Sequence, residues 1–291
     1  MRAIPPLRSL LFCGANRTDK AQQVWGWGAD AVLLDLEDAL APAEKTRLRG
    51  PVVTLLQAHR GTVPALVRIN GTTTPWCFGD ITTLVGPWLD GVLLPKAESA
   101  EEMRMVDWLI GQVERDSGMP AGRTALYALV ETGLGLERAF EIATATPRLA
   151  RLVFGAGDYT RSLGLEWTAG EDELRDARHR LANASAAAGL APPIDAPVLQ
   201  VTDAARFETS AATARRLGFG GKITITAEQT AAANRLFSPS PAQIAWAQDQ
   251  LKAFAEAAAE GKAAIYRNGT QVDKAITDRA RQLLEEAEKL R

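Results

Sequence analysis

Two apolar runs of the sequence end on carboxylates that could work together. The run from Ala125 ends at Glu131, and the run from Leu149 ends at Asp158. If both runs are parallel strands, their carboxyl ends, and with them the two acids, face the same side of the sheet. Two carboxylates can hold a hard cation such as Mg²⁺, which keeps water or substrate oxygens as further ligands. The sequence therefore predicts a metal site at Glu131 and Asp158, although either acid alone could be a helix cap or a surface group.

Other charged residues follow three further apolar runs. They are Glu37 and Asp38, then Arg68, then Lys96. A metal could neutralise an oxyanion or enolate, while the planar guanidinium of Arg68 could grip a carboxylate or an enolate oxygen. The set therefore predicts a site for a substrate with carboxylate and carbonyl oxygens. A ring of salt bridges without a substrate is the alternative.

These charged residues need a scaffold that brings strand ends together. Eight short runs rich in Val, Ile and Leu alternate with amphipathic helical patterns, at 8–15, 31–38, 65–70, 91–96, 125–131, 149–158, 197–201 and 222–226. This alternation predicts a (β/α)8 TIM barrel over residues 1–240. A doubly wound sheet is the competitor, but no glycine-rich dinucleotide motif follows the first run. The short Gly133-Leu-Gly135 sequence is interpreted as a tight turn before a helix.

The pattern changes after the eighth run. A long Ala-rich helix is predicted over 241–260, Asn268-Gly269 is typical of a hairpin turn, and a charged helix is predicted over 276–291. A barrel does not need this C-terminal extension, so residues 241–291 are expected to form a helical lid or to contact a neighbouring subunit. Asp273 lies in this segment and is a candidate acid/base group.

Composition narrows the functional class. The net charge is −2 and the sequence pI is about 5.9, so we expect no nucleic-acid partner. No apolar run is long enough for a membrane helix, and the two cysteines, Cys13 and Cys77, have no paired spacing. A cytoplasmic protein with reduced cysteines is expected. The two histidines, His59 and His179, lie among polar residues and are predicted at the surface, which argues against histidine-based nucleophilic or metal chemistry.

Several motifs together resemble one family. They are Arg8-Ser-Leu-Leu-Phe12, Leu34-Asp-Leu-Glu-Asp-Ala39, Val67-Arg-Ile-Asn70, Leu94-Pro-Lys-Ala-Glu98, Val130-Glu-Thr132, Phe154-Gly with Asp158, Gly221-Lys222, and Phe237-Ser-Pro-Ser240. In this order they resemble the citrate lyase beta-subunit-like proteins of the HpcH/HpaI aldolase superfamily, which includes malyl-CoA and citramalyl-CoA lyases. The resemblance covers nearly the whole chain.

The resemblance implies a homotrimeric TIM barrel that uses Mg²⁺, with Mn²⁺ as an alternative. Its reaction would be reversible carbon–carbon cleavage of a 3-hydroxyacyl-CoA, a coenzyme A thioester, to an acyl-CoA and a 2-oxoacid. By the same resemblance, Glu131 and Asp158 would be metal ligands and Arg68 would contact the oxoacid or enolate. Asp273 would be an acid/base supplied by a neighbouring subunit.

Other site residues are also implied by the resemblance. Glu37 and Asp38 would line the metal shell. Lys96 and Glu131 are expected to contact the substrate, since both follow apolar runs whose ends face the same site. Three basic residues near the first two strands are candidates for binding the CoA phosphates, namely Arg8, Lys45 and Arg49.

Two departures from the family pattern leave alternatives open. Thr226 and Ala227 stand where the family commonly has His-Pro, and the first strand ends on Cys13-Gly14 instead of a proline-containing turn. Both positions are near the expected acyl pocket. The alternatives are a CoA-independent class II pyruvate aldolase, a citrate lyase beta subunit that acts on an acyl-carrier thioester, and a catalytically silent barrel.

Overall fold

Eight short parallel strands close into a barrel. The computed structural model describes residues 6–259, 264–267 and 270–290. The strands pair in sequence order and β8 returns to β1. They are β1 (Ser9–Gly14), β2 (Ala31–Asp35), β3 (Ala65–Arg68), β4 (Gly91–Leu94), β5 (Ala125–Val130), β6 (Leu149–Phe154), β7 (Ile194–Asp195) and β8 (Gly221–Thr224). The prediction of a (β/α)8 barrel is therefore confirmed.

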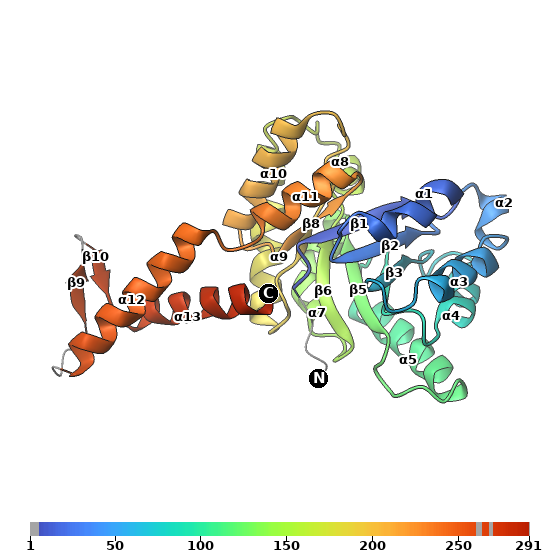
Figure 1. Cartoon of the computed structure of the whole chain (residues 1–291). Coiled ribbons are helices and arrows are strands. Elements are labelled where there is room, and N and C mark those ends of the chain that lie inside the picture. Colours follow the sequence, from blue (N-terminus) through green and yellow to red (C-terminus); the bar gives the residue numbers. More distant parts are fainter. Residues whose placement is uncertain (1–5, 260–263, 268–269, 291) are drawn as a thin grey trace. The chain divides into compact units, whose positions relative to one another are not determined.

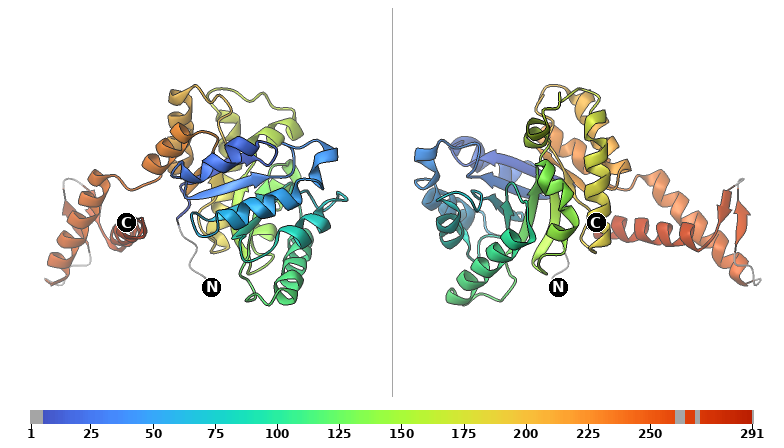
Figure 2. Two further views of the ribbon diagram at one scale, coloured as in Figure 1. Left: turned by 45° about the vertical axis from the view of Figure 1, so that its right-hand side comes forward. Right: turned by 180° about the vertical axis from the view of Figure 1, so that it is seen from behind.

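Helices follow the strands and encircle the barrel (Figures 1 and 2). They are α1 (Thr18–Gln23), α2 (Pro42–Lys45), α3 (Arg49–Ala58), α4 (Cys77–Leu84), α5 (Ala100–Asp116), α6 (Gly133–Glu137), α7 (Ala139–Ala143), α8 (Ala156–Leu163), α9 (Arg175–Ala187), α10 (Ala204–Arg216) and α11 (Ala227–Leu236), with 3₁₀ turns η1 (Val24–Gly26) and η2 (Asp172–Leu174). Side-chain caps set several helix starts. The Ser99 hydroxyl, for example, accepts a hydrogen bond from the Glu102 amide at the start of α5.

Three local predictions were wrong. The seventh strand is Ile194–Asp195 and not 197–201, because the later apolar residues Leu199 and Val201 leave the sheet and are exposed. Strand β6 ends at Phe154, so Asp158 lies in the first turn of α8. The two glycines at 133 and 135 form the first turn of α6, not a turn before it, because the Thr132 hydroxyl caps that helix.

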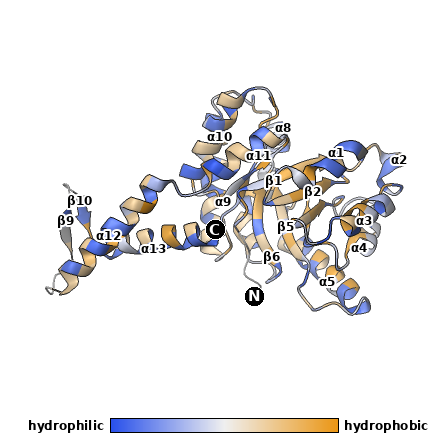
Figure 3. Cartoon of the chain, viewed as in Figure 1, coloured by the Kyte–Doolittle hydropathy of each residue, from blue (hydrophilic) through white to orange (hydrophobic). Residues whose placement is uncertain are grey.

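Apolar residues form two layers. One cluster fills the barrel interior and includes Leu10, Leu33 and Leu129, while a larger cluster lies between strands and helices and includes Leu11 and Val32. The alternation of neighbours such as Leu10 and Leu11 follows from the period of two in a strand. In Figure 3 the strands are largely apolar, whereas helices such as α10 are of mixed polarity.

Among the described residues, no cysteine or histidine belongs to a group of side chains that could hold a metal ion. Cys13 and Cys77 are free and buried, as predicted. His179 is exposed, as predicted. The prediction for His59 was wrong in detail, because its ring is half-buried and stacks on Trp25 with centroids 4.6 Å apart.

A buried charge network joins β7 and β8 to the outer helices. Asp195 on β7 accepts hydrogen bonds from Lys222 on β8 and from Arg178 on α9, and Arg178 also donates to Glu171. The Lys222 ammonium donates a further hydrogen bond to the Ser210 hydroxyl at 2.9 Å. Burial raises the pKa of the Asp195 carboxyl, but Lys222 and Arg178 outweigh that effect and hold it below its usual range. The network pairs two buried cations with two buried acids.

We expect Lys222→Met to lower the free energy of unfolding by about 3–5 kcal/mol, because it leaves an excess buried carboxylate. Urea unfolding of the whole chain measures this, with the exposed Lys252→Met as the matched control. The double variant Lys222→Met/Asp195→Asn should recover part of the loss, since Arg178 and Glu171 then balance. If Lys222→Met lowers the free energy of unfolding by less than about 1 kcal/mol, which is typical of a surface ion pair, Lys222 is not an essential member of a buried charge network.

A second compact unit begins at Ser238, after the barrel unit of Leu7–Phe237. It contains α12 (Pro241–Ala259), β9 (Ile265–Arg267), β10 (Thr270–Val272) and α13 (Lys274–Lys289), and α12 packs along α13. Strands β9 and β10 pair antiparallel, while the predicted turn at Asn268-Gly269 lies outside the described residues. Within the part of the chain that the structure describes, no helix combines the length and apolar character needed to cross a membrane.

Candidate active site

The carboxyl ends of β2 and β3 hold a rigid ion pair. Asp35 and Arg68 are register partners, and the Arg68 guanidinium donates two hydrogen bonds to the Asp35 carboxylate at 2.6 and 2.8 Å. Asp35 also accepts from the backbone amides of Glu37 and Ala39, which fixes the loop that follows β2. The remaining Arg68 nitrogen, Nη1, lies 3.1 Å from Glu37 Oε2. This bidentate geometry gives Arg68 one fixed orientation.

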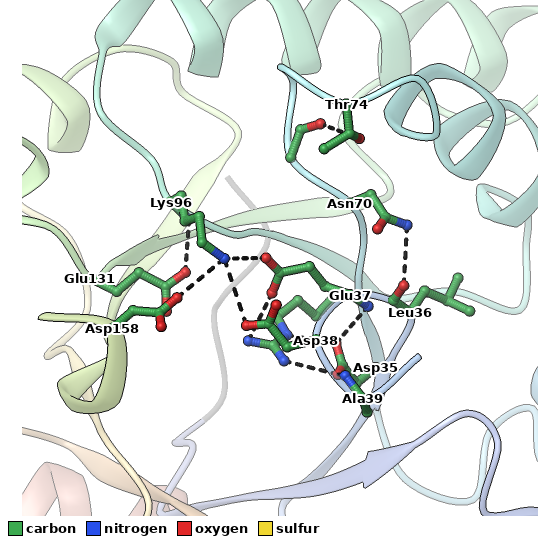
Figure 4. Close-up of polar contacts among 12 residues, drawn as sticks. Asp35, Leu36, Glu37, Asp38, Ala39, Asn70, Thr74, Lys96, Glu131 and Asp158 are labelled. Carbon is green, nitrogen blue, oxygen red and sulfur yellow. Dashed lines mark hydrogen bonds and ion pairs between the residues drawn. The ribbon is translucent and has the colours of Figure 1, made fainter. Parts of the chain in front are cut away.

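Lys96 lies at the centre of the acidic residues. Figure 4 shows its ammonium group between Glu131 and Asp158 on one side and Glu37 and Asp38 on the other. It pairs with Glu37 and lies 3.2 Å from Asp158 Oδ2 and 3.6 Å from Asp38 Oδ2. The Lys96 backbone has φ of 48°, which is uncommon for a residue with a side chain, and its amide donates to Glu131 Oε1 at 3.0 Å. Strained backbone of this kind is concentrated at functional sites.

Glu131 and Asp158 reach the same centre from different elements. Glu131 directly follows β5 and is 3% exposed. Asp158 projects from the first turn of α8 and also pairs with Arg161 at 3.0 Å. Gly155 makes this approach possible, because a Cβ there would lie 2.4 Å from Glu131 Oε2. A side chain at 155 would therefore displace the Glu131 carboxylate.

Burial dominates the electrostatics of the two innermost glutamates. It raises the pKa of Glu131 to about 8, against the opposing effect of the Arg68 and Lys96 cations. Burial also raises the pKa of Glu37, and the same two cations limit that rise. Burial acts in the same direction on Asp35, but its hydrogen bonds with Arg68 bring the pKa of that carboxyl below its ordinary value. At neutral pH the Glu131 carboxyl is therefore largely protonated, and a bound cation would displace that proton.

The donor set suits a hard divalent cation. Glu37 Oε2 and Asp158 Oδ2 are buried and have ion-pair contacts but no hydrogen-bond donor. The described residues contain no group of three His, Cys, Asp or Glu side chains arranged as a complete metal cage. Glu131 and Asp158 would instead supply two carboxylates and leave the other positions to water or substrate, which is how Mg²⁺ is commonly held. The residues therefore fit the predicted metal.

A pocket of about 230 Å³ opens beside these acids. Its polar end is formed by Asp38, Arg68, Glu131 and Asp158, and the rest of its lining is mainly apolar. The sequence-predicted residues at the ends of β2, β3, β5 and β6 thus surround one cavity. An arrangement of acids, one arginine and an apolar cavity can bind a small oxygen-rich substrate and stabilise negative charge on it.

The three basic residues predicted for CoA phosphates are not brought together at this pocket. Arg8 precedes β1 at the amino end of the barrel and donates to Asp30 at 2.7 and 2.9 Å. Arg49 donates to Asp80 and to the Trp76 carbonyl. Both side chains are therefore tied to partners within the barrel.

Lys45 is likewise buried and bonds to the loop that follows β2. Its ammonium donates to the Glu37 carbonyl at 2.9 Å and to Asn70 Oδ1 at 2.6 Å, and lies over the Trp76 ring. The resemblance suggested Lys45 for a phosphate, whereas in the structure its ammonium bonds to Asn70, which is distant in the sequence. A phosphate site at Arg8, Lys45 and Arg49 therefore stays a prediction, and each of the three side chains has a partner within the barrel.

Asp273 belongs to the second unit and begins α13. Its Oδ1 atom accepts hydrogen bonds from the backbone amides of Ala275 and Ile276, at 2.9 and 3.2 Å. Within this unit Asp273 is therefore an N-cap residue.

Thr226 has a similar local role in the barrel. Its hydroxyl accepts a hydrogen bond from the Gln229 amide at 3.2 Å, so the departure from the His-Pro pattern provides the N-cap of α11. Gln229 then secures the neighbouring loop, because its amide group bonds to the Ile225 amide and the Val198 carbonyl.

Sequence reasoning missed two features. Asp35 was hidden inside an apolar strand, although an acid at the end of a buried strand implies a cationic partner. A polar pocket after β1 was also missed. It is lined by Asn16, Arg17, Asp19, Lys20, Gln23 and Trp27. The Lys20 ammonium donates to the Ile225 carbonyl at 2.9 Å, and Ile225 is one of the residues that line the acidic pocket.

Comparisons with known proteins agree with this architecture. Residues 8–227 match the model of the HpcH/HpaI aldolase/citrate lyase family. Citrate lyase subunit beta of Leuconostoc mesenteroides subsp. cremoris is 33% identical, covering 95% of this chain and 92% of that protein. The L-malyl-CoA/beta-methylmalyl-CoA lyase of Cereibacter sphaeroides is 31% identical, covering 97% and 95%.

A solved structure extends the likeness to three dimensions. The protein CitE from Mycobacterium tuberculosis, in complex with magnesium, acetoacetate and coenzyme A, superposes with a TM-score of 0.79 and 29% identity, covering 99% of this chain and 100% of that chain. The family match spans most of the barrel and the curated relatives align over nearly their full length. This chain therefore belongs to the HpcH/HpaI aldolase/citrate lyase family.

Proposed function

We propose that this protein is a Mg²⁺-dependent carbon–carbon lyase that cleaves or forms a 3-hydroxyacyl-CoA. The observation that carries the proposal is the convergence of Asp38, Arg68, Glu131 and Asp158 on one pocket at the carboxyl end of the barrel. The malyl-CoA lyase relative, and the CitE structure with magnesium and coenzyme A, support the same chemistry.

Glu131 and Asp158 would hold the metal. When bound, Mg²⁺ supplies Lewis acidity that favours the alkoxide form of the substrate hydroxyl and the carbonyl of the 2-oxoacid. A carboxylate of the β2 loop, Glu37 or Asp38, takes the hydroxyl proton. The bond between C2 and C3 then breaks, C3 becomes the carbonyl carbon of the oxoacid, and the bonding electrons pass into the thioester enolate. Arg68, fixed by Asp35, stabilises that negative charge.

The thioester needs a place for the phosphates of CoA. Arg17 and Lys20 line the polar pocket, and Lys20 donates to the carbonyl of Ile225, a residue of the acidic pocket. Trp27 offers an aromatic face beneath Lys20, 5.7 Å from the ammonium. Cationic side chains beside an open polar pocket suit phosphate groups. We assign the CoA phosphates to this pocket in place of Arg8, Lys45 and Arg49.

Protonation of the enolate carbon completes the reaction. Asp273 lies in the second unit, and the described residues that line the acidic pocket include no histidine. The proposal therefore gives this proton transfer to Asp273 of a neighbouring chain within a homotrimer.

Mass spectrometry of CoA species tests the reaction class directly. The chain is incubated with Mg²⁺, acetyl-CoA or propionyl-CoA, and glyoxylate, pyruvate or oxaloacetate, beside an EDTA control. A new hydroxyacyl-CoA that EDTA abolishes is the expected result. Free hydroxyacid would instead indicate thioester hydrolysis after condensation.

Absence of any changed CoA species would contradict the proposal. Turnover of acyl-carrier thioesters would then identify a citrate lyase beta subunit, and turnover of free hydroxy-oxoacids a CoA-independent aldolase. Metal and oxoacid binding without any turnover would identify a silent barrel.

A further inference from the structure

We propose that Thr132 and Glu98 are positioning residues for the carboxylate of Glu131, through a hydrogen bond between their side chains that we call the threonine–glutamate link. The inference rests on the proposed function for the identity of the ion that Glu131 would bind. Neither Thr132 nor Glu98 is among the described residues that line the acidic pocket. The link would therefore act on the site from outside the pocket.

The two oxygens of the Glu131 carboxylate have different neighbours. Oε1 accepts a hydrogen bond from the Lys96 backbone amide at 3.0 Å (Figure 4). Oε2 lies beside Gly155, where a Cβ atom would come within 2.4 Å of it. The orientation of the carboxylate therefore depends on the Lys96 peptide staying in place.

The Lys96 peptide needs support from the residues around it. Its φ of 48° is left-handed, and a residue with a side chain keeps such a conformation only when the surrounding structure holds it there. One support comes from the next residue, because the Ala97 amide donates to the Leu129 carbonyl of β5 at 3.0 Å. This bond fixes one side of the loop that joins β4 to α5.

The threonine–glutamate link supports the other side of this loop. The Thr132 hydroxyl donates to Glu98 Oε1 at 2.7 Å and accepts from the Gly135 amide at 3.1 Å. A hydroxyl can make both bonds at once, because it is a donor and an acceptor. Thr132 directly follows Glu131, and Glu98 is the second residue after Lys96. The link thus joins the chain on both sides of the bond between Lys96 and Glu131.

The backbones of α6 and the loop also meet directly. A Cβ at Gly135 would lie 2.5 Å from the Ala97 carbonyl oxygen, which is a backbone atom, so only glycine allows this approach. The Glu98 backbone has its own partners, since its amide donates to Glu102 at 3.0 Å and its carbonyl accepts from Arg138 at 3.3 Å. A change of the Glu98 side chain therefore removes the link and leaves these backbone bonds.

Loss of the link should loosen the hold on Glu131. The Lys96 peptide could then relax from its left-handed conformation and turn its amide away from Oε1. The Glu131 carboxylate would gain rotational freedom and would no longer be oriented in advance for an ion. Groups that orient a metal ligand in this way typically contribute about 10- to 100-fold to metal affinity.

Glu98→Leu and Glu98→Gln form a charge-matched pair that tests the link. Both remove the carboxylate, but glutamine keeps an oxygen that can accept from Thr132. Hydrogen exchange of the full chain should be at least about tenfold faster at the Lys96 and Ala97 amides in Glu98→Leu, which corresponds to one hydrogen bond to a charged group. Exchange in Glu98→Gln should stay close to that of the unchanged chain. The α6 amides should exchange as before in both variants, because Thr132 still caps that helix.

Metal affinity shows whether the link reaches Glu131. Titration with Mn²⁺, monitored by electron paramagnetic resonance, should show about 10- to 100-fold weaker binding by Glu98→Leu than by Glu98→Gln. If Glu98→Leu does not fold, Thr132→Val and Thr132→Ser serve as the second pair, because serine keeps the hydroxyl and valine has the same shape without it. Thr132→Val should lose protection at Lys96 and Ala97 as well as in α6, and Thr132→Ser should restore both.

Three results would overturn the proposal. They are equal exchange in Glu98→Leu and Glu98→Gln, faster exchange with unchanged Mn²⁺ affinity, and loss of protection in Thr132→Val that is confined to α6. Failure of the lyase proposal is a separate result, because hydrogen exchange requires neither turnover nor a CoA product. If a product forms but the charge-matched pair behaves alike, the lyase proposal stands and the positioning role of Thr132 and Glu98 fails.

Discussion

Glu131→Gln is expected to abolish Mg²⁺-dependent turnover, with a loss of at least about 10³-fold, while the barrel remains folded. Glutamine has the shape of a protonated glutamate but cannot become a carboxylate ligand. Since burial raises the pKa of Glu131 to about 8, the neutral form already predominates at pH 7 and its replacement should be well tolerated. The Lys96 amide can still donate to the remaining carbonyl oxygen.

A measurement of metal affinity shows whether Glu131→Gln acts by removing a metal ligand or by disturbing the pocket in general. Titration with Mn²⁺, monitored by electron paramagnetic resonance, should show that the affinity of Glu131→Gln for Mn²⁺ is reduced by more than about 100-fold. Loss of a residue that only supports a metal ligand typically costs about 10- to 100-fold. Glu137→Gln is the matched control, because Glu137 is an exposed acid that pairs with Arg180. Normal Mn²⁺ affinity in Glu131→Gln would remove this residue from the metal site.

Site residues were predicted most accurately from the sequence where they lie at the end of a strand or directly after it. Arg68 ends β3 and Glu131 follows β5, so the runs that predicted the barrel also located these side chains. Asp158 was identified from the same pattern but lies in α8, because β6 already ends at Phe154 and the helix begins at Ala156. Periodicity locates the mouth of a barrel, whereas the path of each loop depends on packing between distant residues.

The roles of Lys45 and Asp35 depend on long-range partners. Lys45 looks like part of a solvated basic patch, yet it is buried against Asn70, which is 25 positions away. Asp35 is the last residue of β2 and was missed as a site residue, because its partner is Arg68, 33 positions away. Their charge is compatible with several roles. The role of each residue is set by the folded structure, which brings one particular partner within hydrogen-bond distance and keeps other charged groups away.

Asp273→Asn is expected to lower kcat by about 10²–10⁴-fold, the usual contribution of a general acid or base, with oxoacid and Mn²⁺ binding retained. Asparagine caps a helix about as well as aspartate, so α13 should still begin at Lys274 and the stability should be unchanged. Asp273→Ala removes the cap as well and should also cost about 1 kcal/mol of stability.

This pair separates proton transfer from helix capping. If Asp273 acts only as a cap, Asn should be nearly silent and Ala alone should reduce turnover, through unfolding of α13. If it transfers the proton, both variants lose turnover alike although their stabilities differ. Asp278→Asn, on the same helix and with its carboxylate paired with Lys274 and Arg281, is the matched control.

Mixing Asp273→Asn chains with Glu131→Gln chains tests whether one site is built from two chains, because each inactive chain keeps the residue that the other lacks. Recovered turnover in the mixture requires that Asp273 of one chain serve the barrel of another, whereas two inactive populations that stay inactive when mixed and reassembled would place Asp273 and Glu131 of the same chain in one site.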